Sequence, residues 1–237
     1  LFRSKNQRHR QSYNEKREAK NMIEYTALIV AAGSGSRMGL GYNKMLFKLK
    51  NGHTILEETI QVFQKDTRCH QIIVVASKED IEVFMKLCTQ GNIVFVQGGA
   101  TRQDSVYHGL KAVMCEHVLI HDGARPWLTM DCIDRIVESL QVHDACLLMM
   151  PVKDTIKVVE DGKVKTTPQR ATLYQAQTPQ AFRTSAILKA YHKAYQKQLQ
   201  ASDDAQIMEL CGDHEVYVVE GSYGNMKVTT IEDIAGK

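Results

Sequence analysis

Near its amino end the chain has a glycine-rich segment that also carries two cationic side chains. An apolar run, LIVAA, leads into GSGSRMGLGYNK, which places Arg37 and Lys44 among Gly33, Gly35 and Gly39. Glycine has no Cβ, so consecutive backbone N–H groups can turn toward an anion, while a guanidinium and an ammonium group add positive charge. These residue types at this spacing predict a site for a polyphosphate such as a nucleotide.

Two better-known glycine motifs do not fit this segment. From Gly33 the pattern is G-x-G-x-x-x-G, which is one residue longer than the dinucleotide-binding fingerprint. Lys44 follows Asn43 rather than a glycine, so the segment is not a P-loop either. An ordinary strand-to-loop turn stays open as the alternative, although the two cations favour phosphate binding.

Further motifs follow other expected strands. Residues 98–100, Gly-Gly-Ala, follow one strand, and residues 122–126, Asp-Gly-Ala-Arg-Pro, follow the next. In a parallel sheet the carboxyl ends of the strands meet at one edge, and ligands bind there. We therefore expect these two motifs to converge with the glycine-rich segment in a single site.

The elements that must position this site alternate along the chain. Short apolar runs predict strands, and amphipathic segments between them predict helices. The predicted strands lie near residues 27–32, 72–76, 93–96, 117–121 and 146–151. This order predicts an α/β fold with a Rossmann-like, mostly parallel sheet covered by helices on both faces.

Two helix starts can be read from capping residues. Thr54 with Glu57 begins one helix, and Thr101 with Asp104 begins another. The expected inward stripe of the second helix consists of Val106, Leu110 and Val113.

Residues 152–174 break this alternation. DTIKVV, an Asp-Gly pair and KVKTT predict two polar strands joined by a tight turn, that is, a protruding β-hairpin arm. Because an isolated hairpin is marginally stable, we expect the arm to pack on a second copy of the chain in a homodimer. A hairpin lying on its own domain is the alternative.

Charge separates the beginning of the chain from the rest. The 237 residues have a net charge of +3, but residues 1–21 hold seven Lys or Arg against two Glu. Residues 22–237 therefore contain 23 basic and 25 acidic side chains, a net charge of −2, which argues against a nucleic-acid partner. We interpret residues 1–21 as a basic leader added to or upstream of one domain, with a disordered nucleic-acid-binding arm as the alternative.

Cysteine usage and hydropathy exclude several other classes of protein. The six cysteines form no C-x-x-C pair, and the nine histidines show no zinc-ligand spacing. Scattered cysteines in apolar surroundings are typical of reduced proteins, and no apolar stretch is long enough for a membrane span. We expect a cytoplasmic protein without a membrane partner.

Seven ordered segments resemble the 2-C-methyl-D-erythritol 4-phosphate cytidylyltransferase family, and the resemblance extends over nearly all of residues 22–234. The segments are AAGSGSRMG with Asn43 and Lys44, GGATRQDSVYHGL at 98–110, HDGARP at 121–126, PVKDTIK at 151–157, AQTPQAF at 176–182, SDDA at 202–205 and GSYGNMKVTT at 221–230. Seven segments in order are far more specific than one glycine loop.

The resemblance implies an enzyme that transfers the cytidylyl group of CTP to a sugar-alcohol phosphate, 2-C-methyl-D-erythritol 4-phosphate. Pyrophosphate would be released, Mg²⁺ would assist, and the product would serve isoprenoid precursor synthesis by the non-mevalonate route. In-line attack of one phosphate on another requires charge neutralisation and alignment rather than covalent work by the protein, so the cationic cradle suits this reaction.

The resemblance also implies roles for individual residues. Arg37 and Lys44 would stabilise charge on the α-phosphate, and Arg170 would reach across from the partner subunit. The residues implied to position the acceptor are Arg170, Lys227, Thr155, Ser202 and Arg125. The residues implied to bind the nucleotide are Ala31, Ala32, Gly33, Ser34, Gly35, Gly99, Ala100, Ser105, Asp122 and Gly123. Asp122 is also a possible metal ligand.

Three departures from the family pattern and two other functions stay open. Ser202 stands where threonine is usual, Tyr174 where tryptophan is usual, and Tyr42 lies beside the cradle lysine. Ribitol-5-phosphate cytidylyltransferases are related, but their pattern usually carries K-Q-F after the cradle, whereas this chain has N-K-M-L at 43–46. A non-catalytic nucleotide-binding module is the more remote alternative.

Overall fold

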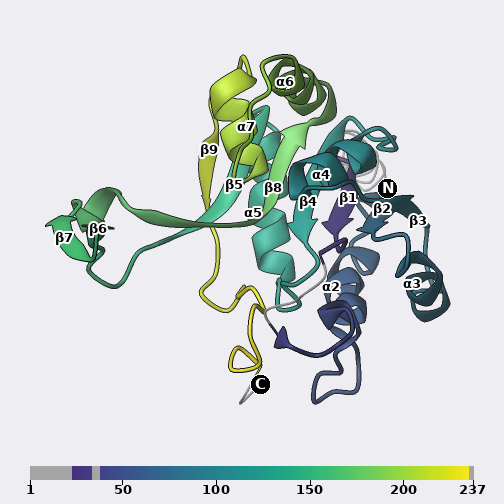
Figure 1. Cartoon of the computed structure of the whole chain (residues 1–237). Coiled ribbons are helices and arrows are strands. Elements are labelled where there is room, and N and C mark those ends of the chain that lie inside the picture. The colour runs from purple at the N-terminus through teal and green to yellow at the C-terminus, as the bar shows by residue number, and fades with distance from the viewer. Residues whose placement is uncertain (1–22, 34–37, 235–237) are drawn as a thin grey trace, which may run out of the picture.

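The computed structural model describes residues 23–33 and 38–234, in which a seven-stranded sheet forms the centre of the molecule (Figure 1). The strands are β1 (Tyr25–Val30), β2 (Cys69–Ala76), β3 (Ile93–Gln97), β4 (His117–Asp122), β5 (Ala145–Pro151), β8 (Tyr174–Arg183) and β9 (Tyr217–Glu220). Their spatial order is β3-β2-β1-β4-β8-β5-β9, and every pair is parallel except the two that β8 makes with β4 and β5. The prediction of a mostly parallel sheet is confirmed.

The five predicted strands are present, but β8 and β9 were not predicted. β8 is a buried strand with polar side chains, among them Gln177, Thr178 and Gln180, so hydropathy does not reveal it. Each finds a specific partner: the amide of Gln180, for example, donates to Asp203 and accepts from the backbone of Ala205. Buried polar groups are tolerated when they are paired in this way.

Helices cover both faces of the sheet, as predicted. One face packs against α2 (Ile55–Gln64), α3 (Ile81–Leu87) and α5 (Met130–Leu140), and the other against α4 (Arg102–Leu110), α6 (Thr184–Gln196) and α7 (Asp204–Cys211). Alternate side chains of one strand enter the two cores, because successive residues of a strand point to opposite faces.

The two predicted capping boxes are confirmed. The side chains of Thr54 and Thr101 each accept the N–H three residues on, and the acidic residue at that position returns a bond to the capping backbone. Val106 and Leu110 are buried as expected, but α4 ends at Leu110, so Val113 packs on the core from beyond the helix.

The arm is a hairpin that extends from the body (Figure 1). Its strands, β6 (Val158–Glu160) and β7 (Lys163–Thr166), pair only with each other and are exposed throughout. Asp161 and Gly162 at the tip have φ values of 47° and 73°, the left-handed values that a tight turn of this kind needs. The predicted hairpin is therefore present at the predicted place.

None of the helices within residues 23–33 and 38–234 has the length and apolar character that crossing a bilayer would need.

Candidate active site

A pocket of about 540 Å³ lies at the carboxyl ends of β1, β3 and β4, beside the last described segment of the chain. The predicted site residues that line it are Ala31, Ala32, Gly33, Lys44, Gly99, Ala100, Ser105, Asp122 and Lys227. The expected convergence of the glycine-rich segment with the motifs after β3 and β4 is therefore present. Ser34, Gly35 and Arg37 lie outside the described residues.

Asp122, at the end of β4, is the acidic side chain among the pocket-lining residues, and three cations surround it. Its carboxylate lies 2.9 Å from the Lys227 ammonium, 3.5 Å from Arg125 Nε and 3.7 Å from Arg102 Nε. Burial alone would raise the pKa of this carboxyl, but the cations, Lys227 foremost, hold the pKa well below its usual range. Asp122 is therefore an anion at every physiological pH.

Lys44 opens a short 3₁₀ helix, η2 (Lys44–Leu46), that Asn43 caps. The Asn43 side chain accepts from the Met45 N–H at 3.0 Å and donates to Asp80 Oδ2 at 2.7 Å, so the start of the turn is tied to Asp80. The Lys44 ammonium is buried and donates to the carbonyl of Val228 at 2.7 Å. A lysine held inside the pocket in this way is not a solvated surface lysine.

Arg102 is a pocket cation that the sequence argument did not select. It begins α4 and forms a two-bond pair with Asp204, with Nη1 at 3.2 Å and Nη2 at 2.7 Å from the carboxylate oxygens. Asp204 is fully buried and also accepts from Tyr191 at 2.6 Å. Arg102 therefore joins Asp122 to the segment that contains Ser202. Its place directly after the capping Thr101 was the available signal.

The loop after β3 borders the pocket because glycine occupies its tightest positions. A Cβ on Gly99 would lie 2.3 Å from Cβ of Asp104, and one on Gly98 would lie 2.7 Å from Cβ of Ala32. The Ser105 hydroxyl accepts from the Gly99 N–H at 3.1 Å and donates to the carbonyl of Thr101 at 2.9 Å. In this structure Ser105 thus fixes the loop that faces the pocket.

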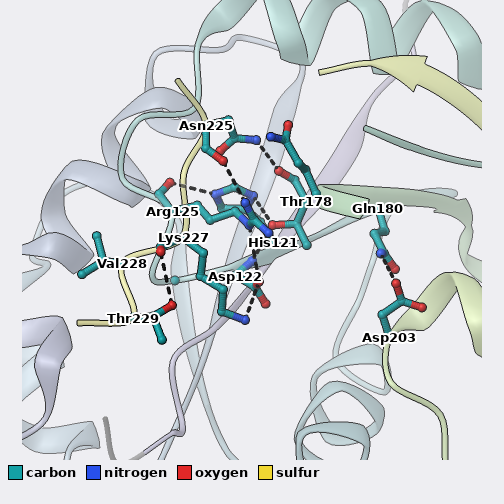
Figure 2. Close-up of polar contacts among 12 residues, drawn as sticks. His121, Asp122, Arg125, Thr178, Gln180, Asp203, Asn225, Lys227, Val228 and Thr229 are labelled. Carbon is teal, nitrogen blue, oxygen red and sulfur yellow. Dashed lines mark hydrogen bonds and ion pairs between the residues drawn. The ribbon is translucent and has the colours of Figure 1, made fainter. Parts of the chain in front are cut away.

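Behind Asp122 lies a buried chain of hydrogen bonds (Figure 2). The Asp122 N–H donates to the Thr178 hydroxyl oxygen at 3.0 Å, and this hydroxyl lies 3.0 Å from His121 Nδ1. His121 Nε2 lies 3.1 Å from the carbonyl of Arg125, which can only accept. Nε2 therefore carries the proton, and Nδ1 accepts from Thr178. Burial lowers the pKa of His121 to about 4, which keeps the ring neutral.

Some predicted site residues support the pocket without lining it. Arg125 donates through Nη1 to the carbonyl of Asn225 at 2.8 Å, and the carbonyl of Gly123 accepts from the Thr59 hydroxyl at 2.8 Å. Ser202 is exposed just before α7. Arg125 and Gly123 therefore adjoin the pocket, and the roles of all three residues toward a ligand stay predictions.

Thr155 and Arg170 lie on the arm and are exposed. Arg170 starts a 3₁₀ turn, η3 (Arg170–Thr172), and donates to the carbonyl of Lys153 at 3.0 Å. Neither residue lines the pocket of its own chain. Their predicted contact with the acceptor of a partner subunit stays a prediction.

Among the described residues, no group of three or more His, Cys, Asp or Glu side chains is arranged to hold a metal ion. Asp122, the predicted possible ligand, already has three cations around it. A further cation bound directly by this carboxylate would meet their repulsion. The side chains of residues 23–33 and 38–234 alone therefore do not fit a metal centre.

Sequence comparison finds one family of known proteins along nearly the whole chain. A family model described as 2-C-methyl-D-erythritol 4-phosphate cytidylyltransferase matches residues 25–236. The protein of that name from Bacillus mycoides is 44% identical over 215 residues, which cover 89% of this chain and 94% of the relative. The one from Alkaliphilus oremlandii is 42% identical over 222 residues, covering 90% and 93%.

Solved structures give the same result. The 4-diphosphocytidyl-2C-methyl-D-erythritol synthase of Anaerococcus prevotii superposes with a TM-score of 0.81 at 35% identity, covering 91% of this chain and 94% of that one. The 2-C-methyl-D-erythritol 4-phosphate cytidylyltransferase of Thermus thermophilus gives a TM-score of 0.76 at 31% identity, covering 90% and 96%.

Proposed function

Because the chain belongs to the 2-C-methyl-D-erythritol 4-phosphate cytidylyltransferase family, it is a nucleotidyltransferase, and we propose that it works at the pocket around Asp122. Its reaction transfers the cytidylyl group of CTP to 2-C-methyl-D-erythritol 4-phosphate in the synthesis of isoprenoid precursors. An oxygen of the acceptor phosphate attacks the α-phosphorus of CTP, the bond to the β-phosphate oxygen breaks, and pyrophosphate leaves.

The observation that carries this proposal is the excess of cations around the pocket. Among the residues that the structure describes, Lys44, Arg102 and Lys227 line it together with a single carboxylate, that of Asp122. Two anionic substrates repel each other, and positive charge in a partly enclosed site cancels this repulsion where it is strongest. Such a site is suited to bringing a phosphate monoester and a triphosphate together.

The catalytic step is assigned to Lys44 and Arg37. The Lys44 ammonium is already held on one side by the carbonyl of Val228, and an ammonium has three donors, so this bond is compatible with donation to a phosphate oxygen. Stabilising the charge that develops on the α-phosphate is worth a few kcal/mol for one such donor.

The acceptor phosphate is assigned to Lys227 together with Arg170 of the partner subunit. The Lys227 side chain is 40% exposed and forms an ion pair with Asp122 at 2.9 Å. Binding of the acceptor would exchange this partner for the phosphate, after which Asp122 would be available to accept from substrate hydroxyl groups. Thr155 of the partner arm and Ser202 are assigned to the same acceptor, and Arg125 keeps Asp122 in place.

The nucleotide is assigned to the first and third strand ends. Backbone N–H groups of Ala31–Gly33 would face the phosphates, and Gly99 with Ala100 would face the base across the loop that Ser105 fixes. We expect CTP to be used much faster than UTP. Equal rates with the two nucleotides would remove the assignment of this loop to the base.

Mg²⁺ is assigned to the substrate rather than to a cluster of protein side chains. When bound to the triphosphate, the ion would neutralise part of its charge. The steps described above are assigned to side chains of the two protein subunits.

The arm and the cysteines support two further parts of the proposal. The arm residues point to a homodimer, because Arg170 and Thr155 do not reach the pocket of their own chain. All six cysteines are free thiols, which fits a reducing compartment such as the cytoplasm.

The test is a pyrophosphate-release assay with paired acceptors. We expect release to require both CTP and 2-C-methyl-D-erythritol 4-phosphate, and to be much slower with ribitol 5-phosphate. Faster release with ribitol 5-phosphate would assign the chain to the related acceptor. Binding of CTP without release on any acceptor would make the pocket a nucleotide-binding module.

A further inference from the structure

Residues 225–229, which we call the strap, contact the side chains of Arg125 and Lys44. Figure 2 shows the strap beside Arg125 and Asp122. The strap contributes Lys227 itself, which pairs with Asp122. One of its backbone carbonyls accepts from Arg125, and another accepts from Lys44, which lies 184 residues earlier in the sequence. The spacing between the catalytic lysine and the acceptor lysine is therefore set by one short piece of backbone.

The strap is fixed at its middle and at both ends. The N–H of Val228 donates to the carbonyl of Ala124 at 2.8 Å, so the strap lies against the turn that follows β4. At its far end the N–H of Thr229 donates to Asp233 Oδ2 at 2.7 Å. At its near end the Asn225 side chain donates to the carbonyl of Thr178 at 2.8 Å.

Asn225 is the buried side-chain anchor of the strap. It is fully buried, and its Oδ1 finds no hydrogen-bond partner among the described residues. An unpaired buried acceptor is costly, so the side chain is not explained by a gain in stability from that atom. Its donated bond ties the strap to β8, the strand that also supplies the hydroxyl bonded to Asp122 and His121.

We propose that Asn225 is a positioning residue for the transfer reaction: its bond to Thr178 holds the strap so that Lys44 and Lys227 keep their productive separation. The inference rests on the catalytic role of Lys44 proposed above. Misplacement of a catalytic group by about 1 Å can cost about 100-fold in rate, so a small shift of the strap is sufficient to slow the reaction.

The first test compares Asn225→Ala and the nearly isosteric Asn225→Asp with the wild type. Both lose the donor to Thr178. We expect kcat to fall between about 10- and 100-fold and KM for the sugar phosphate to rise at least about 3-fold, with KM for CTP changed less than about 2-fold. A purely structural role would lower the active fraction and leave both KM values unchanged, and that result overturns the proposal.

Asn92→Ala is the matched control. Asn92 also donates to a backbone carbonyl, that of His70 at 3.0 Å, but it precedes β3 at the opposite end of the sheet. We expect its kinetic constants to match those of the wild type. A loss equal to that of the Asn225 variants would mean that any lost amide bond slows the enzyme, which also overturns the proposal.

The second test is a double-mutant cycle with Lys44→Ala. If Asn225 acts on turnover through Lys44, the Asn225 substitution should lower kcat by less than about 3-fold in the Lys44→Ala background, because one of the two lysines whose separation it keeps is absent. The same fold-loss in both backgrounds overturns the inference while leaving the role of Lys44 intact. Normal turnover of Lys44→Ala alone instead removes the proposed role of Lys44.

The third test uses the other anchor and remains decisive if the Asn225 variants do not fold. Asp233 Oδ2 accepts from the N–H groups of Thr229 and Thr230, at 2.7 and 2.9 Å. We expect Asp233→Ala to reproduce the fall in kcat and Asp233→Asn, which keeps an acceptor, to restore most of it, with the exposed Asp213→Ala as the unaffected control. Equal losses of kcat in Asp233→Ala and Asp233→Asn would indicate an effect of the lost charge and would overturn the proposal that the strap positions the lysines.

Discussion

The pocket and the arm differ in what holds their functional side chains. In the pocket, partners come from distant parts of the sequence: Arg102 and Asp204 are 102 residues apart, and Lys44 and Val228 are 184 apart. In the arm, partners are close in sequence, as for Lys157 and Thr167, and both strands are exposed. The pocket side chains are held by long-range contacts within the body, whereas the arm strands pair only with each other.

Under the proposed function, this difference divides the site into a half that the body prearranges and a half that the arm of a partner chain supplies. The cations around Asp122 are placed before any substrate arrives, because buried partners on several strands and helices fix them. Arg170 and Thr155 lack such partners, apart from the bond between Arg170 and the carbonyl at the root of the arm. Substitutions in the two regions should therefore have different kinds of effect.

The largest effect is expected in the prearranged half. Lys44→Ala should lower kcat about 100- to 1,000-fold, since it removes a donor that acts on transition-state charge, with little change in KM for CTP. The measurement is steady-state pyrophosphate release. Lys48→Ala, four residues on and exposed, is the control and should keep normal turnover. Equal losses of kcat in both variants would contradict a specific catalytic role for the buried Lys44.

The next effect tests the supplied half. Arg170→Ala should raise KM for the sugar phosphate and lower kcat/KM by about 10- to 100-fold, the range for losing a charge-assisted bond to a phosphate. A mixed dimer of Arg170→Ala and Lys44→Ala chains should recover activity, because one of its two sites combines an intact pocket with an intact arm. A mixed dimer as inactive as its parents would show that each arm serves its own chain.

The sequence predicted local features of both regions well. The capping boxes at Thr54 and Thr101 and the Asp-Gly turn of the arm depend only on neighbouring residues, and all three are present. The convergence of three motifs in one pocket followed from the rule that strand ends meet at one edge of a parallel sheet. The resemblance to the family added the substrates, which spacing alone does not indicate.

Long-range partners could not be predicted from the sequence. Strand β8 inserts antiparallel between β4 and β5, and its buried glutamines look like loop residues until their partners are known. Arg102 and Asn225 make their bonds to residues about 100 positions away, which the capping Thr101 beside Arg102 does not reveal. The missing information was the pairing of distant segments.

A smaller effect is the pH dependence of stability, which the buried His121 behind the pocket should produce. The pKa of His121 is lowered to about 4 in the folded protein, against about 6.5 when unfolded, so the unfolded state binds more protons between these values. Stability from this ring is complete above pH 6.5 and falls by up to about 3 kcal/mol as the pH drops to 4. Urea unfolding across this range should show the slope.

His121→Gln is the variant that isolates this contribution. Glutamine does not titrate, so the variant should be less stable at pH 7.5 but should lose less stability than the wild type between pH 6.5 and 4. His117, whose pKa burial also lowers, contributes to the slope in both proteins and cancels in the difference. Parallel curves for the two proteins would show that His121 is not held neutral by the fold.

The smallest effect is expected at the tip of the arm, where one substitution can be compared in both regions. Gly162 has a φ of 73° with nothing within 4 Å of an added Cβ, so Gly162→Ala should cost about 1 kcal/mol or less and leave the unfolding of the body unchanged. Gly99→Ala places its Cβ 2.3 Å from that of Asp104 and should cost about 1–3 kcal/mol, with slower turnover. Urea unfolding measures the stability of both variants, and sedimentation measures their oligomeric state.

Gly162→Ala could instead lower the stability of the body as much as Gly99→Ala does. The arm and the pocket would then unfold as one cooperative unit, and the division between a prearranged and a supplied half would be wrong.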